Sequence, residues 1–152
     1  MAFFSADLEF GNRIQRKVLE EVYKLPYREK DGCFKDYDAE VFRNGRIEYF
    51  EFKADRRTLQ TGNLAIEMLC SGKPSGIWAT KADFWIHCVV DGEDVLEVYE
   101  LPVKTLSEMV TRQLYSSIRE TDDGRTVMYL FPRGVFSSYS VWAKGATRPD
   151  ER

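Results

Sequence analysis

The sequence predicts one α+β domain in which a mixed β-sheet is flanked by helices. Three observations lead to this fold class. Residues 12–25 repeat apolar side chains at helical spacing, residues 36–53 contain two strand-like runs around an Asn-Gly dipeptide, and further strand-like runs follow. With 152 residues, 43% of them hydrophobic, the chain is long enough for a single core. We expect the domain to span residues 1–143 and the polar residues 144–152 to form a flexible tail.

The first predicted element is an amphipathic helix over residues 12–25. Its apolar side chains recur every three or four residues, as one buried helix face requires, and Pro26 ends it because proline cannot continue the helical hydrogen bonding. Gln15 lies on the same side as the apolar residues, whereas Glu20 points largely away. The helix therefore has one polar side chain that faces inward.

The second element is a hairpin of strands 36–42 and 47–53. Asn44 and Gly45 lie between the strands, and this dipeptide favours a two-residue type I′ turn. The second strand carries apolar residues on both faces, which indicates a central strand that is covered on both sides.

The remaining elements are mostly strands. We expect, in order, a strand at 63–70, a loop at 71–76, a short helical turn at 80–83, strands at 84–90 and 94–101 joined by a turn at Asp91-Gly92, a helix at 105–119 and a strand at 126–131. The helix prediction depends on Thr105 and Glu108, which match a capping box at a helix N-terminus.

The composition excludes several classes of protein. Three cysteines, Cys33, Cys70 and Cys88, lie far apart, which favours reduced thiols in the cytoplasm over a disulfide framework or a cysteine-rich zinc module. His87 is the single histidine, so a metal site with two histidines cannot form within the chain. We find no signal-peptide pattern and no apolar run of the roughly 20 residues that cross a membrane. We therefore expect a soluble cytoplasmic protein without a membrane partner.

The hairpin carries the residues that indicate chemistry. A two-residue turn fixes the register, so Asp38 faces Glu51 across the two strands, with Cβ atoms about 4.5–5.5 Å apart. Like charges so placed repel each other, and a divalent cation such as Mg²⁺ would compensate them. Lys53 lies two residues beyond Glu51, hence on the same face, where it can meet a phosphate or an attacking water. Hydrolysis of a phosphodiester needs these groups.

A purely structural interpretation stays open from the residues alone. Asp36 would face Lys53 across the ladder and could form a plain salt bridge, and neighbouring arginines could neutralise the two carboxylates on a solvated face. Lys53 is, however, the one lysine in the chain with an acidic residue two positions before it, and an aspartate stands opposite that residue. This coincidence favours the chemical interpretation.

These residues resemble the PD-(D/E)xK nuclease superfamily. Asp38, then Glu51-Phe52-Lys53 on the following strand, with a helix before both, is similar to the order in Holliday-junction resolvases and small phage-borne endonucleases. Further matches to the phage-borne members are Phe10-Gly11 before the first helix, Asp55, Thr61-Gly62-Asn63 and Pro74-Ser75-Gly76-Ile77. The resemblance covers about residues 8–90.

The resemblance implies a restriction-endonuclease-like core and a nuclease that cuts DNA, duplex or branched, with Mg²⁺ or Mn²⁺ as its cofactor. Asp38 and Glu51 would bind the cation through carboxylate oxygens, and the backbone carbonyl of Phe52 would be a further ligand. Lys53 would orient or activate the attacking water. A phage-encoded member would act in the host cytoplasm, and a junction resolvase would be a homodimer because it makes two symmetric cuts.

Two more residues are candidates for the site. Many relatives place an acidic residue on the first helix, and here the inward-facing position holds Gln15, a neutral residue that could position water or leave room for a single cation. Glu67 lies on a strand that could adjoin the hairpin, although a carboxylate at a strand edge explains it as well. For His87 we expect a hydrogen-bonded position in the core or at a strand edge, not a general base.

Four basic residues are candidates for DNA contact: Arg56, Arg57, Lys73 and Lys81. The two arginines follow the hairpin, and the two lysines flank a Gly/Pro/Ser loop whose amide groups could meet phosphates. Ordinary solvated surface is the alternative for each of them. The net charge of -3 and the neutral Gln15 favour two other functions, a non-catalytic DNA-binding protein or a phage accessory protein that retains the nuclease scaffold.

Overall fold

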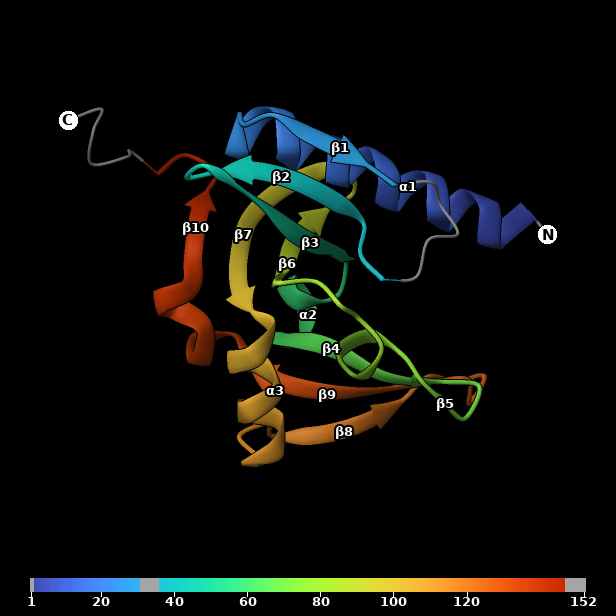
Figure 1. The fold of residues 1–152 in the computed structure, drawn as a ribbon. Coiled ribbons are helices and arrows are strands. Elements are labelled where there is room, and N and C mark those ends of the chain that lie inside the picture. The colour runs from blue at the N-terminus through green and yellow to red at the C-terminus, as the bar shows by residue number, and fades with distance from the viewer. Residues whose placement is uncertain (1, 31–35, 147–152) are drawn as a thin grey trace.

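Helix α1 lies along one face of a six-stranded sheet, and a second sheet covers the opposite face (Figure 1). The computed structural model describes residues 2–30 and 36–146, so Cys33 and most of the predicted tail lie outside the described residues. The α+β class and the mixed sheet are confirmed. The second sheet is a departure from the single sheet that the sequence predicts.

The first helix is longer than predicted. α1 (Ala2–Val18) begins well before residue 12 and continues as a π-helical turn, η1 (Leu19–Tyr23). Phe10 and Gly11 therefore lie inside the helix, not before it. Burial of Phe10 against the sheet explains the difference, because tertiary packing outweighs the low helix propensity of the glycine that follows. Lys24, with a left-handed φ of 55°, ends the helix.

The first sheet has the strand order β1-β2-β3-β6-β7-β10. β3 and β6 run parallel, and every other pair of neighbouring strands in this sheet runs antiparallel. The strands are β1 (Tyr27–Glu29), β2 (Ala39–Arg43), β3 (Arg46–Asp55), β6 (Phe84–Asp91), β7 (Asp94–Pro102) and β10 (Ser140–Ala143). In this sheet the sequence does not predict β1 and β10, which are the short edge strands.

The predicted hairpin register is confirmed. Ala39 pairs with Phe50 and Arg43 pairs with Arg46. Asn44 and Gly45 have φ angles of 55° and 78°, as a type I′ turn requires. The ladder nevertheless ends at the Ala39–Phe50 pair, so the predicted strand 36–42 begins three residues late and Asp38 lies just outside it.

The second sheet is antiparallel with the strand order β5-β4-β9-β8. Its strands are β4 (Asn63–Cys70), β5 (Lys73–Pro74), β8 (Ser117–Glu120) and β9 (Thr126–Pro132). Helix α2 (Thr58–Thr61) precedes β4, the 3₁₀ turn η2 (Gly76–Trp78) follows β5, and the 3₁₀ segment η3 (Arg133–Tyr139) follows β9.

One helical prediction is right only in part, and another is wrong. The predicted helix 105–119 is α3 (Val103–Thr111), and its last residues instead form strand β8. α3 begins after Pro102, with no side-chain cap, and ends before Gln113, whose φ is 57°. The predicted turn at 80–83 is an irregular segment that bonds to the hairpin region, because Asp83 donates its N–H to the Tyr49 carbonyl at 2.7 Å. Long-range pairing thus decides both segments.

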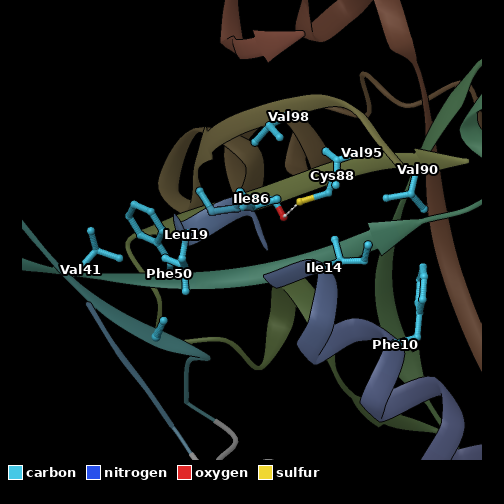
Figure 2. Packing of buried hydrophobic residues seen from close by; sticks show 12 residues of the cluster. Phe10, Ile14, Leu19, Val41, Phe50, Ile86, Cys88, Val90, Val95 and Val98 are labelled. Atoms are coloured by element: carbon cyan, nitrogen blue, oxygen red, sulfur yellow. Dashed lines mark hydrogen bonds between the residues drawn. The ribbon is translucent and has the colours of Figure 1, made fainter. Parts of the chain in front are cut away.

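The core has two parts, one on each face of the first sheet. Figure 2 shows the first part, in which Leu19 lies near Phe50 and Ile86 of the sheet, and Ile14 and Phe10 lie at the other end, toward Cys88 and Val90. The second part fills the space between the two sheets and includes Trp85, Tyr99, Leu106, Phe131 and Phe136. Alternate residues of β6 contribute to the two parts. Within the described residues, the longest helices lack the length and apolar character to cross a membrane.

Candidate functional site

Asp38 and Glu51 lie together where β2 and β3 cease to pair. The Asp38 backbone N–H donates to the Phe50 carbonyl at 2.9 Å, and its Oδ2 accepts the backbone N–H of Phe52 at 2.7 Å. The two carboxyl groups share a hydrogen bond. Such a bond requires that one of the two groups carries a proton. The side chains therefore meet as the register predicts, although Asp38 is outside the regular ladder.

Burial changes the titration of both carboxyl groups. Burial, the nearby charge of Asp38 and the hydrogen bond to it raise the pKa of Glu51 to about 9. Burial also raises the pKa of Asp38, and this effect outweighs the hydrogen bonds from Glu51 and the Phe52 backbone. Neither carboxylate forms an ion pair with any lysine or arginine that the structure describes. The pair therefore holds a proton at neutral pH.

The backbone of Phe52 faces the same pair. Its N–H bonds to Asp38 and therefore points away from β6, the other neighbour of β3. The N–H and C=O of one strand residue point to the same side, so the Phe52 carbonyl also faces the Asp38 side. This is the orientation that the predicted backbone ligand needs.

Lys53 lies between two cavities. The smaller, about 150 Å³, is also lined by Gln15 and Asp38, and the larger, about 470 Å³, is also lined by Arg56 and Arg57. The structure describes both Asp36 and Lys53, and the alternative ion pair between them does not form. Instead, Oδ1 of Asp36 lies 3.8 Å from Nζ of Lys81. Lys53 thus lines both the cavity that Asp38 lines and the cavity that the arginines line.

Basic side chains line the larger cavity from both sheets. Arg56 and Arg57 come from the end of β3, and Arg119 comes from β8 of the second sheet. The Arg56 guanidinium lies 3.6 Å from the centre of the Phe10 ring, and its Nη1 lies 3.6 Å from Oδ1 of Asp7. Sequence reasoning missed Arg119 because it assigned this residue to the predicted helix 105–119, whereas the structure places it on strand β8.

The other two predicted DNA contacts lie elsewhere. Lys73 is an exposed residue of the short strand β5, and Lys81 pairs with Asp36. Neither lines the larger or the smaller cavity. The structure therefore brings two of the four predicted basic residues to Lys53.

The negative charge of Glu67, on β4, contributes to the raised pKa of Glu51, so the two side chains are near each other. Its backbone is packed against Gly76 of η2, which has a φ of 52°, and a Cβ on Gly76 would lie 2.1 Å from the Glu67 carbonyl oxygen. Glycine is required at this approach. In residues 2–30 and 36–146, no group of three or more acidic, histidine or cysteine side chains is arranged to hold a metal ion by itself.

Gln15 is buried, with 6% of its surface exposed, and its side chain is bound to a second residue near the site. Its Nε2 donates to Oε2 of Glu29 at 2.8 Å, and the charge of Glu29 contributes to the raised pKa of Asp38. Sequence reasoning missed Glu29. It belongs to the three-residue strand β1, whose pairing with β2 places Glu29 opposite Ala39, and such a short strand has no periodic signal.

A separate polar chain holds the end of β3 in place. Trp85 Nε1 donates to Nδ1 of the fully buried His87 at 3.0 Å, so Nε2 carries the proton of the neutral ring and donates to Oδ2 of Asp55 at 2.8 Å. Burial opposes the Asp55 charge, but the bonds from His87 and from the backbone of Arg57 and Ala65 hold its pKa well below the usual range. His87 is thus a satisfied core residue.

The chain matches no protein-family model, and no curated protein matches its sequence.

Proposed function

We propose that the protein is a metal-dependent DNA endonuclease of the PD-(D/E)xK type with a restriction-endonuclease-like core. One observation carries the proposal. The half-buried Asp38–Glu51 pair lacks a basic partner among the described residues, and Asp38 lines the same cavity as Lys53, which also lines the larger cavity with the arginines. Two half-buried carboxyl groups without a counter-charge destabilise a fold, and such groups gather at functional sites.

The residues at the site fit a hard divalent cation. Carboxylate oxygens of Asp38 and Glu51 and the carbonyl oxygen of Phe52 would hold Mg²⁺ or Mn²⁺. This ligand set contains neither sulfur nor histidine. The cation would supply Lewis acidity and a water of lowered pKa.

The remaining residues would bind and orient the substrate. The Lys53 ammonium would contact the scissile phosphate and offset the negative charge that develops on it. Arg57 and Arg119 would bind phosphates on either side of the larger cavity and position the strand. Positioning and charge compensation account for most catalysis at a phosphate group.

The test is cleavage of plasmid, linear duplex and four-way-junction DNA with Mg²⁺ or Mn²⁺. We expect the parent to cut at least one of these, and Glu51→Gln and Lys53→Met to lose at least about 100-fold in rate, the size of effect of a transition-state contact. Glu40→Gln is the matched control, because Glu40 pairs with Arg28 and lines neither cavity. Cleavage by Glu51→Gln at the parent rate would refute the proposal.

Preference for branched DNA belongs to the same proposal. A resolvase of this kind cuts a junction at two symmetric points and therefore acts as a homodimer. Sedimentation of the protein with and without a four-way junction, beside the cleavage assay, separates this subtype from a monomeric duplex nuclease.

A non-catalytic DNA-binding protein on the same scaffold is the second candidate. Gln15 in place of an acidic residue favours it, together with the lack of a three-carboxylate group in the described residues. This function predicts DNA binding that needs no divalent cation and that survives Asp38→Ala. Binding that EDTA abolishes would argue against it.

A further inference from the structure

The amide of Gln15 has a fixed orientation. Its Nε2 lies 2.8 Å from Oε2 of Glu29, and a carboxylate can only accept hydrogen bonds. The NH₂ group must therefore face Glu29, and the carbonyl oxygen Oε1 lies on the other side of the planar amide. Gln15 and Asp38 line the same cavity of about 150 Å³. The hydrogen bond to Glu29 thus decides which atom Gln15 can offer to that cavity.

Glu29 itself is engaged through both oxygens. Oε2 accepts from Gln15, and Oε1 accepts from Nε of Arg16 at 3.0 Å. Its side chain is 20% exposed. Glu29 also lies beside Asp38 along the β1–β2 ladder, because the next residue, Lys30, donates its backbone N–H to the Asp38 carbonyl at 2.8 Å. Both oxygens of Glu29 are thus engaged by residues of the first helix, Gln15 and Arg16.

We propose that Glu29 is a positioning residue, which orients Gln15 so that the Gln15 carbonyl oxygen serves the cation held by Asp38 and Glu51. This inference depends on the proposed function. Glutamine carbonyls are accepted ligands of hard cations, either directly or through a bound water. The amide adds an oxygen without adding charge, and Arg16 compensates the charge of Glu29. The site then has two carboxylates for one divalent ion per chain.

The arrangement explains why a neutral residue suffices on the helix. An acidic residue at position 15 would lie within hydrogen-bonding distance of Glu29, where two carboxylates repel each other. Glutamine instead donates a hydrogen bond to the Glu29 carboxylate, and this bond fixes the orientation of the glutamine amide. Partners that orient a ligand in this way typically change metal affinity 10–100-fold when they are removed.

The test is Mn²⁺ binding to the full chain, measured by calorimetry and by electron paramagnetic resonance. The parent should bind one Mn²⁺ per chain. Glu29→Gln removes the charge that fixes the amide, and we expect its Mn²⁺ affinity to fall about 10–100-fold. The matched control is Glu40→Gln, which also removes an acidic partner of an arginine on the β1–β2 ladder and should keep the parent affinity. Melting of the metal-free variants checks that each one folds.

A swap variant separates orientation from mere packing. Gln15→Glu combined with Glu29→Gln keeps a hydrogen bond between the two positions with its direction reversed and places carboxylate oxygens at the cavity. We expect it to bind Mn²⁺ at least as tightly as the parent. If the pair were only structural, the folded single and double variants would all bind Mn²⁺ equally.

The outcomes distinguish the two proposals. Glu29→Gln that folds and binds Mn²⁺ like the parent refutes the role of Glu29 and leaves the proposed function intact. A swap variant as weak as Glu29→Gln refutes it also. A parent that binds no Mn²⁺ refutes the proposed function and this inference together.

Discussion

At the residue scale, the hydrogen bond between Asp38 and Glu51 links metal binding to proton release. The pair holds a proton in the metal-free protein, because the pKa of Glu51 is raised to about 9. A divalent cation binds deprotonated carboxylates, so it must displace this proton.

We therefore expect Mn²⁺ affinity to rise with pH until the pH passes about 9, where the pair has lost its proton. At pH 7, calorimetry in buffers with different heats of ionisation should show about one proton released for each ion bound. An affinity that is constant between pH 6 and pH 9 would contradict the shared proton.

The same group makes the stability of the metal-free protein depend on pH. The pKa of Glu51 is higher in the fold than its ordinary value of 4.5, so the fold binds this proton more tightly than the unfolded chain does. Its contribution is complete below about 4.5 and is lost as the pH rises through about 9. We expect the melting temperature to fall across this range, and to fall less in Glu51→Gln, by calorimetry in EDTA. An identical slope in the variant would show that other groups cause it.

At the scale of elements, the hairpin could be predicted and its surroundings could not. Asn44 and Gly45 determine the turn through their own φ angles, so the register of β2 and β3 follows from local chemistry, and with it the meeting of Asp38 and Glu51. In contrast, Ser117–Glu120 is a strand only because it pairs with β9. Its helix prediction used a capping box that does not form. Local signals decide local elements, and pairing over distance decides the rest.

The site divides in the same way. Asp38, Glu51 and Lys53 lie on one hairpin, and their proximity could be inferred from its register. Glu29 reaches the site through an edge strand, and Arg119 reaches the larger cavity through the second sheet. Both positions depend on contacts between distant parts of the chain, which a search for sequence motifs cannot detect.

The contact between η2 and β4 provides a stability test at this scale. Gly76→Ala forces a Cβ to within 2.1 Å of the Glu67 carbonyl oxygen, in addition to the left-handed strain at a φ of 52°. Gly92→Ala is the matched control, with a φ of 59° and nothing within 4 Å of its Cβ. We expect the control to lose about 1–2 kcal/mol and Gly76→Ala to lose clearly more, in urea unfolding. Equal losses would mean that this approach relaxes freely.

At the scale of the whole molecule, charge is distributed unevenly. The chain has a net charge of -3, yet the larger cavity has four basic side chains, from Lys53, Arg56, Arg57 and Arg119, beside three aspartates, Asp7, Asp55 and Asp122. Long-range attraction to DNA is therefore weak, and affinity depends on the cavity itself.

This distribution predicts which basic residues bind DNA. Arg57→Ala and Arg119→Ala should each weaken DNA binding and reduce the slope of log affinity against log salt by about 1. Lys73→Ala and Lys81→Ala should leave both quantities unchanged, because neither lysine lines the cavity. Fluorescence anisotropy with a labelled duplex across a salt series, with Ca²⁺ in place of Mg²⁺, measures both. Loss of binding in the lysine variants and not in the arginine variants would place the DNA on the surface that carries Lys73 and Lys81.

The parallel pairing of β3 with β6 has a consequence for the order of folding. Two parallel neighbours need a long crossover, and here the crossover, residues 56–83, contains α2, β4 and β5. β4 pairs with β9, and β6, β7 and α3 lie between these two strands in the sequence. The hairpins close short loops and should form first, whereas the pairing of β4 with β9, which completes the second sheet, closes a long loop. We therefore expect the acidic pair to assemble early, on a chain that does not yet have the cavity wall carrying Arg119.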